Sequence, residues 1–310
     1  MVKIKQFIKE KIAEIKREVG KEKVLVATSG GVDSLTCALL GFRAVKENLS
    51  CVFIDDGLMR LDEGKEVAAV LKRFKIPLKI YEYRARFFST LKGLTDPEEK
   101  RRAFRDAFYN TLGEILKKEN AKFLIQGTIK ADIVETKGGI KTQHNVLEQI
   151  GINPETYGLK ILEPLKDLYK DEVRKVAKAL GLPKAVYQRM PFPGPGLATR
   201  ILGEVTPERV AILQKATKIV EGMTKRIPSF QTFAVLLSDR ATGQKEGKRV
   251  FGEIIALRSV QSKNALTAKI TPLPYPLLAK ITKKIVEECP TVVKVLYDIT
   301  PKPPSTIEWI

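Results

Sequence analysis

Histidine and cysteine are scarce in this chain, and their scarcity limits the chemistry that it can perform. Its 310 residues include one histidine, His144, and three cysteines, Cys37, Cys51 and Cys289. The cysteines are odd in number and show no CxxC spacing, so neither a disulfide framework nor a zinc site is predicted. None of them lies in a glycine-rich turn of the kind that presents a nucleophile, so we expect no Cys-His-Glu triad.

Long apolar runs are also missing. No uninterrupted apolar stretch approaches the roughly 20 residues that a membrane-spanning helix needs. Residues 1–19 carry charges at helical spacing, which is unlike a signal peptide. We therefore expect a soluble protein of the cytoplasm that does not act at a membrane.

Positive charge is plentiful but dispersed. Lysine and arginine number 55 against 36 acidic residues, which gives a formal net charge of +19 at pH 7. A clustered excess would predict a nucleic-acid partner. The lysines instead alternate with glutamates, as in residues 9–23, and no arginine-rich tail is present. The pattern favours a solvated lysine-rich surface and no nucleic-acid partner, although anionic small substrates would still be attracted.

Strand and helix patterns alternate through the first half of the chain. Short apolar runs, typical of strands buried on both faces, lie at residues 24–28, 49–57, 77–83 and 121–128. Helical patterns lie around and between them, at residues 4–19, 35–45, 63–74, 97–119 and 167–180. The alternation predicts an α/β fold: a parallel sheet with helices on both faces and a ligand beyond the carboxyl ends of its strands.

Residues 190–200, MPFPGPGLATR, are too rich in proline and glycine for a regular helix or strand, and they predict a joint between domains. Beyond them, helices are predicted at residues 207–225 and 276–289. Three apolar runs, at 230–238, 249–260 and 291–300, predict the antiparallel strands of a small α+β unit. The length is enough for two domains, which we place at residues 1–185 and 186–310.

The strongest chemical signal is SGGVDS, residues 29–34, between the first buried strand and a helix. Two glycines let the backbone approach an oxyanion, two serines add hydroxyl groups, and the N–H groups of the helix start attract phosphate. The motif is neither Walker A nor GxGxxG. Asp33 would repel phosphate unless a divalent cation stood between them, so the pattern predicts Mg²⁺ at Asp33. The alternative is that Asp33 only caps the helix.

SGGVDS resembles the pyrophosphate loop of the ATP-pyrophosphatases, which cleave ATP between its α and β phosphates and transfer AMP to a carbonyl-type oxygen. Further stretches resemble, in order, the synthetase portion of the GMP synthases, and together they cover nearly the whole chain. They are DDGLMRLDE, DPEEKRRAF, QGTIKADIVET, EPLKDLYKDEVRKVAKALGLP, PFPGPGLATRILGEVTPER and KPPSTIEWI. PFPGPGL and KPPxTIEW are the most specific of these motifs.

The resemblance implies a fold and a reaction. The fold is an ATP-pyrophosphatase domain, of the adenine nucleotide alpha hydrolase-like type, followed by a small α+β domain that forms a homodimer and helps bind XMP. In the implied reaction, ATP adenylates the C2 oxygen of XMP with Mg²⁺ as cofactor, and ammonia then displaces AMP to give GMP. Because this chain has no obvious triad, the ammonia is expected from a separate glutaminase subunit, with free ammonia as a substitute.

Position within these motifs implies roles for individual residues. The resemblance assigns ATP binding to Ser29, Gly30, Gly31, Val32, Asp33 and Ser34, with Asp33 also as metal ligand and catalytic residue. It assigns XMP binding to Arg101, Arg200, Lys302 and Glu308. A lid over the reacting groups is implied at residues 132–145, with catalytic roles for Asp132, Glu135, Lys137, Lys141 and His144. Here the chain departs from the family, which usually has histidine where Gln143 stands.

Two other functions share the loop. A tRNA-modifying ATP-pyrophosphatase would fit the loop and the net charge of +19, but it predicts a reactive cysteine pair and an RNA-binding extension, and the sequence shows neither. A nucleotide sensor without catalysis would share the fold, and the intact Asp33 together with the charges of the lid argues against it.

Overall fold

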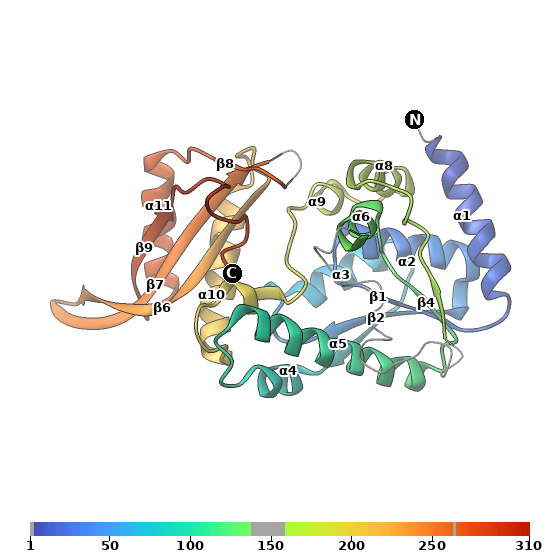
Figure 1. Cartoon of the computed structure of the whole chain (residues 1–310), viewed down its shortest axis with the longest axis horizontal. Helices are drawn as coiled ribbons and strands as arrows, with labels where there is room; N and C mark the ends of the chain where they lie inside the picture. Colours follow the sequence, from blue (N-terminus) through green and yellow to red (C-terminus); the bar gives the residue numbers. More distant parts are fainter. Residues whose placement is uncertain (1–2, 138–158, 263–264) are drawn as a thin grey trace. The chain divides into compact units, whose positions relative to one another are not determined.

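The computed structural model describes residues 3–137, 159–262 and 265–310 (Figure 1). The chain divides into two compact units, each made of three segments. The first unit comprises residues 1–55, 62–83 and 106–189, and the second comprises residues 56–61, 84–105 and 190–310. The domain boundary after residue 185 stays a prediction. In the part of the chain that the structure describes, no helix is long and apolar enough to cross a membrane.

Five parallel strands form the sheet of the first unit, in the order β3-β2-β1-β4-β5. Their bounds are Leu78–Glu82 for β3, Leu49–Asp55 for β2, Val24–Ala27 for β1, Phe123–Ile125 for β4 and Lys160–Leu162 for β5. The first three residues of the central strand, β1, are at most 1% exposed because helices cover both faces of the sheet. The predicted parallel α/β sheet is therefore confirmed, whereas the short edge strand β5 had no distinct sequence signal.

The helices of the first unit fix where β1 ends. On one face, α1 (Ile4–Val19), α2 (Val32–Val45) and α8 (Lys170–Leu180) pack against one another, and α5 (Pro97–Glu119) covers the other face (Figure 1). Ten of the fourteen residues of α2 are buried, so this helix is held firmly beside the sheet. The described residues of this unit also form α3 (Glu63–Lys72), α6 (Lys130–Lys137), α9 (Lys184–Tyr187) and the 3₁₀ turn η1 (Lys46–Asn48).

Helix α8 starts three residues later than the sequence pattern predicts, at Lys170 instead of Asp167. At its start the Glu172 carboxylate accepts a hydrogen bond from the N–H of Tyr169 at 3.0 Å, which is the glutamate half of a capping box. At the other end Gly181, with φ of 93°, forms the C-cap. The helix therefore begins with Lys170 in its first turn, a position that matters for the site below.

The second unit is built on a four-stranded sheet centred on β7. Strand β6 (Gln231–Lys245) pairs antiparallel with β7 (Lys248–Gln261), and β8 (Lys269–Ile270) and β9 (Val292–Asp298) also pair with β7. Helix α10 (Pro207–Thr224) packs on β6, and α11 (Tyr275–Glu288) packs on α10 and β9. The unit also contains α4 (Arg84–Leu91), which the sequence pattern did not reveal.

Strand β9 corrects one prediction. We expected antiparallel strands throughout this unit, but β9 runs parallel to β7. The reason is the connection between them: α11 carries the chain back along the sheet before β9 begins, and such a helical crossover produces a parallel pair.

The segment rich in proline and glycine, residues 190–200, ends in one short 3₁₀ turn, η2 (Gly196–Arg200), all of whose residues are buried. Lys100, which is itself fully buried, donates hydrogen bonds to the carbonyls of Ile201 (2.7 Å) and Gly203 (2.5 Å) just beyond this turn. Burial of the ammonium group lowers the pKa of Lys100 to about 8. The turn is thus fixed from within the second unit.

Candidate active site

The loop between β1 and α2 forms an open cradle of polar groups. The Ser34 hydroxyl lies 3.3 Å from the Thr28 hydroxyl, accepts a hydrogen bond from the Ser29 N–H (3.3 Å) and donates to the Gly31 carbonyl (3.1 Å). In the described part of the chain, no side chain caps the start of α2 at Gly31. The first N–H groups of this helix therefore have no intrahelical acceptor and face the loop, as an anion site requires.

Gly30 brings the loop backbone close to a buried ion pair. Its φ of 80° lies in the left-handed region, and a Cβ added there would stand 2.4 Å from the Glu63 carboxylate. Glu63 is 2% exposed and is paired with both terminal nitrogens of Arg189. The pair packs against Gly30 and thereby supports the backbone of the loop at this residue.

Asp33, in the first turn of α2, has one paired and one unpaired carboxylate oxygen. Oδ2 accepts from the Lys170 ammonium, whereas Oδ1 is buried and has no hydrogen-bond partner among the residues that the structure describes. Burial raises the pKa of the Asp33 carboxyl, Lys170 opposes that rise, and nearby Asp132 adds to it. A buried acceptor without a partner is costly, so this oxygen is suited to a ligand that brings positive charge.

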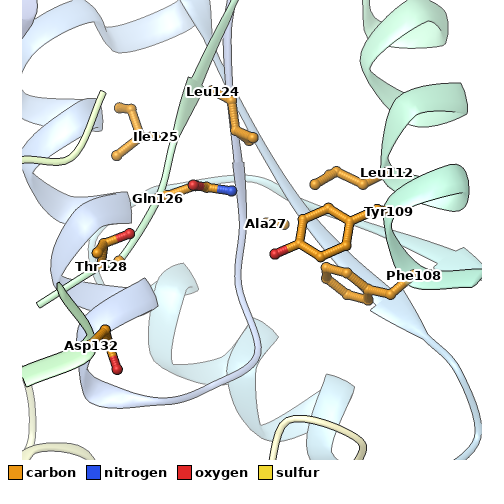
Figure 2. Close-up of a pocket in the computed structure, with 10 residues that line it drawn as sticks. Ala27, Phe108, Tyr109, Leu112, Leu124, Ile125, Gln126, Thr128 and Asp132 are labelled. Atoms are coloured by element: carbon orange, nitrogen blue, oxygen red, sulfur yellow. The ribbon is translucent and has the colours of Figure 1, made fainter. Parts of the chain in front are cut away.

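A pocket of about 220 Å³ lies beside the cradle, at the carboxyl ends of β1 and β4. Figure 2 shows the rings of Phe108 and Tyr109, from α5, turned toward Ala27 at the end of β1 and Gln126 just after β4. Asp132 lines the same pocket. Gly127 joins pocket and cradle, because a Cβ there would stand 3.1 Å from the Cβ of Asp33. A flat apolar ring in the pocket would lie next to an anion on the loop.

The tail of the second unit, residues 300–310, is docked rather than frayed, as its prolines and its single tryptophan predict. Trp309 packs on the buried cluster of Phe233, Val235 and Ala256. The backbone of Lys302 pairs with that of Ala268 in both directions, at 2.9 and 3.0 Å. The Lys302 ammonium donates to the carbonyl of Ala265 at 2.8 Å, which uses one of its three donors.

Arg200 and Glu308 are brought together in the second unit. Arg200, 1% exposed, donates from Nε (3.0 Å) and Nη2 (2.8 Å) to the two carboxylate oxygens of Glu308. The guanidinium also lies 4.2 Å from the ring centroid of Phe233. Gln231 donates to the same carboxylate. This bidentate pair fixes the orientation of Glu308.

Comparison with known proteins identifies the family. Residues 3–183 match the family described as PP-loop domain, and residues 216–309 match the GMP synthase C terminal domain. A protein of Thermococcus kodakarensis, named as the B subunit of glutamine-hydrolyzing GMP synthase, is 48% identical over 98% of both chains. Proteins of the same name from Methanocella arvoryzae and Methanopyrus kandleri are 47% identical over 100% of both chains and 46% identical over 98% of both chains. The chain belongs to this GMP synthase family.

The resemblance to GMP synthases singled out further residues, and the structure describes the surroundings of only some of them. Arg101 lies in α5, half-exposed, and pairs with Glu98 one turn away. Asp132 accepts a hydrogen bond from the N–H of Ile129 at 3.0 Å. Glu135 and Lys137 lie in α6, and nothing further is described of their side chains. Lys141, Gln143, His144 and Asn145, and with them most of the predicted lid, lie outside the described residues.

Three charged residues of this GMP synthase family member were missed by sequence reasoning. Lys170 stands within a motif shared with the GMP synthases, but its contact with Asp33 depends on how α8 packs on α2. Arg189 pairs with a glutamate 126 positions away. Arg258 had the clearest signal: it is a lone cation within the apolar stretch IIALRSV, and a charge in a buried strand requires partners.

Proposed function

We propose that this chain is the synthetase component of a two-subunit GMP synthase. It uses ATP to adenylate the C2 oxygen of XMP, releases pyrophosphate, and lets ammonia displace AMP to give GMP. Family membership supports this function, because both matched regions and the relatives' shared name point to it. The observation that carries it is the cradle at Ser29–Ser34, where the uncapped start of α2 lies in the same turn as the buried Asp33 oxygen that has no hydrogen-bond partner among the described residues.

ATP is assigned to the first unit. Its pyrophosphate lies on Ser29, Gly30, Gly31, Val32 and Ser34, whose backbone and hydroxyl groups supply the donors. Its purine ring enters the adjoining pocket, where Phe108 and Tyr109 offer apolar surface. Lys170 stays beside Asp33 and adds positive charge next to the phosphates.

The residues present fit Mg²⁺ at Asp33. Within residues 3–137, 159–262 and 265–310, no three acidic, histidine or cysteine side chains gather into a metal cage. Mg²⁺ does not require one, because it binds through one or two carboxylates together with substrate phosphates and water. The buried, unpartnered Oδ1 of Asp33 and the neighbouring Asp132 supply this kind of donor set. When bound there, Mg²⁺ neutralises charge that develops on the departing pyrophosphate.

XMP is assigned to Arg101, Lys302, Glu308 and Arg200. Within the described residues the Lys302 ammonium uses one donor, on Ala265, and its other two suit the phosphate. Glu308 accepts from ring or sugar donors of the nucleotide. Because Arg200 uses two donors on Glu308, its first task is to hold that carboxylate, and a phosphate contact would use the others. Catalytic roles for Asp132, Glu135, Lys137, Lys141 and His144 over the adenylated intermediate stay predictions.

The chemistry divides between activation and substitution. The loop N–H groups and the Ser34 hydroxyl stabilise pyrophosphate as the C2 oxygen of XMP attacks the α-phosphorus. The product of this step carries AMP on that oxygen, which makes it a good leaving group for attack by ammonia at C2. Water must be kept away from this intermediate, because hydrolysis would waste the ATP.

The ammonia source is a separate protein. The relatives' name gives them as one lettered component of a glutamine-hydrolyzing enzyme, which supports a partner that hydrolyses glutamine. The chain itself offers one histidine, within the predicted lid, and three buried cysteines, which argues against glutamine hydrolysis within this chain. Homodimer formation and a location in the cytoplasm stay predictions.

One assay tests the proposal. The purified chain is incubated with ATP, Mg²⁺, XMP and either ammonium chloride or glutamine, and AMP, pyrophosphate and GMP are measured. GMP is expected in equal amount to AMP with ammonium and is expected to be absent with glutamine alone. ATP cleavage without GMP in the presence of ammonium would contradict the synthetase assignment, and glutamine turnover by the pure chain would contradict the need for a partner.

A further inference from the structure

Arg258 is a buried cation, and its contacts go to the C-terminal tail and the residue before it. It lies in β7, where its register partners are Phe233 on β6 and Asp298 at the end of β9. Its side chain is 0% exposed, which for an arginine requires that its donors be used within the protein. Arg258 lies in the central strand of the sheet, and it has had no role in the sites described above.

Within the described residues, the four contacts of the Arg258 guanidinium go to the tail or to Asp298, which leads into it. Nε donates to the Ile307 carbonyl (2.9 Å), Nη1 to the Thr300 carbonyl (3.0 Å), and Nη2 to the Thr306 carbonyl. Nη1 also pairs with the Asp298 carboxylate, whose other oxygen accepts the Thr300 N–H at 2.8 Å. One guanidinium thus holds the tail at residue 300 and again at residues 306 and 307.

These two attachment points enclose the residues proposed for XMP. Residues 301–305 form a loop between them, and Lys302 stands within it. Glu308 follows directly after the second attachment point, where Arg200 and Gln231 then orient its carboxylate. Lys302 is also held by its backbone pairing with Ala268, so the contacts at 300, 306 and 307 are not its only anchor. What they fix is the course of the chain between Lys302 and Glu308, and their loss should change the spacing of these two side chains.

Lysine could not replace this arginine. A guanidinium is planar and directs five donors along fixed directions, so it can reach carbonyls on both sides of a loop together with a carboxylate. An ammonium group has three donors at one point and would satisfy only part of the set. The single carboxylate, Asp298, balances the charge, while the carbonyls give the contacts their specificity for the tail.

We propose that Arg258 is a positioning residue of the XMP site, which acts through Lys302 and Glu308 rather than on the nucleotide itself. This inference rests on the proposed function, since it assumes that the tail binds XMP. In this proposal Arg258, a residue of strand β7, holds the tail in place. Lys302 and Glu308 contact the substrate.

The main experiment compares Arg258→Lys with wild type. XMP and ATP affinities are measured separately by calorimetric titration, and KM for each nucleotide is measured in the ammonium-dependent reaction. Arg258→Lys is expected to weaken XMP binding about tenfold or more and to leave ATP affinity within about twofold. Arg240→Lys is the matched control, because Arg240 also donates to a backbone carbonyl of the β6–β7 hairpin but contacts no tail residue in the described structure; it should change neither affinity.

A double-mutant comparison distinguishes positioning from general stability. In wild type, Lys302→Ala should weaken XMP binding; in the Arg258→Lys background the same change should cost much less, because Lys302 is already displaced. Additive losses in the two backgrounds would overturn the proposal. Equal losses of ATP and XMP affinity in Arg258→Lys would overturn it as well.

A milder variant keeps the test decisive if Arg258→Lys fails to fold. Asp298→Asn preserves the size of the side chain and removes the charge that orients the guanidinium, so it should raise KM for XMP several-fold with KM for ATP unchanged. An unchanged KM for XMP in a folded Asp298→Asn protein would refute the inference. If wild type itself bound no XMP, the proposed function would fail; if wild type bound XMP and both variants bound it equally well, only the role of Arg258 would fail.

Discussion

The cradle at Ser29–Ser34 presents backbone N–H groups and an unpartnered carboxylate oxygen, whereas the tail at residues 300–310 is held by arginines that already donate to the protein. In the first region the polar groups are arranged for binding a ligand, and the surrounding helices and strands stabilise the fold. In the second region the same charges both hold the fold and shape the site. Substitutions in the cradle of the first unit should therefore reduce activity without reducing the stability of the fold. Substitutions at the tail of the second unit should reduce both.

The strongest test of this contrast is Asp33→Asn. Activity should fall about a thousandfold, because the amide cannot hold a cation against pyrophosphate. Burial raises the pKa of Asp33, so ionisation of this group costs folding free energy above that pKa, and its removal should not lower the Tm at neutral pH. Steady-state kinetics and thermal melts of the same preparation give both quantities. Asp171→Asn, an exposed change on α8, is the control that should alter neither.

In the second unit, Arg200→Met should reduce both stability and XMP binding. It leaves the Glu308 carboxylate without its bidentate partner, and breaking a buried pair from one side costs about 3 kcal/mol. The double variant Arg200→Met/Glu308→Gln should be more stable than the single variant, since no unpaired charge remains. Urea unfolding measures both. A single variant as stable as wild type would show that the pair contributes nothing to the fold.

Lys302→Ala should weaken binding of one nucleotide only. Loss of a charge-assisted phosphate contact of about 1.5–3 kcal/mol corresponds to a ten- to hundredfold loss of XMP affinity. ATP affinity should change little, because its proposed contacts lie in the first unit. Calorimetric titration with each nucleotide is the measurement. An equal loss for both would mean that the tail has no preference for XMP.

The smallest expected effect concerns a charged network within the first unit that lies outside the site. Glu119, 7% exposed, accepts hydrogen bonds from Ser50 (2.7 Å), Lys79 (2.6 Å) and Tyr81. Burial alone would raise the pKa of Glu119, but these hydrogen bonds lower it to about 2. Because that value lies below the usual 4.5, the stabilisation is complete above pH 4.5 and is lost as pH falls toward 2.

Glu119→Gln should therefore cost about 1–2 kcal/mol at neutral pH and flatten the dependence of stability on pH between 4.5 and 2. Turnover at saturating substrate should stay at the wild-type value. Unfolding curves at several pH values and one activity measurement are sufficient. Glu22→Gln, which removes an exposed pair with Lys122, is the matched control with little expected effect. Reduced turnover in Glu119→Gln would contradict the expectation that stability and activity can be changed separately in the first unit.

Local pattern was enough for most elements but not for the direction of strands or the partners of charges. The run at Val24–Ala27 and the helix at Ile4–Val19 follow from apolar periodicity alone. The parallel direction of β9 depends on where α11 returns the chain, which no periodicity encodes. The loop at Ser29–Ser34 was evident because its residues are contiguous. The contacts of Lys170 with Asp33 and of Arg258 with Thr306 join positions far apart in sequence, so they emerge only from tertiary packing.

The segmented make-up of the second unit has a consequence for how the chain is synthesised. Residues 56–61 and 84–105 belong to that unit, yet all of its other residues, 190–310, are translated only after the last segment of the first unit, 106–189. The early segments leave the ribosome long before their packing partners exist, and they must wait through more than eighty residues of synthesis. A fragment cut after residue 189 would keep these segments exposed. Expression of the second unit alone would need all three segments, joined by designed connections.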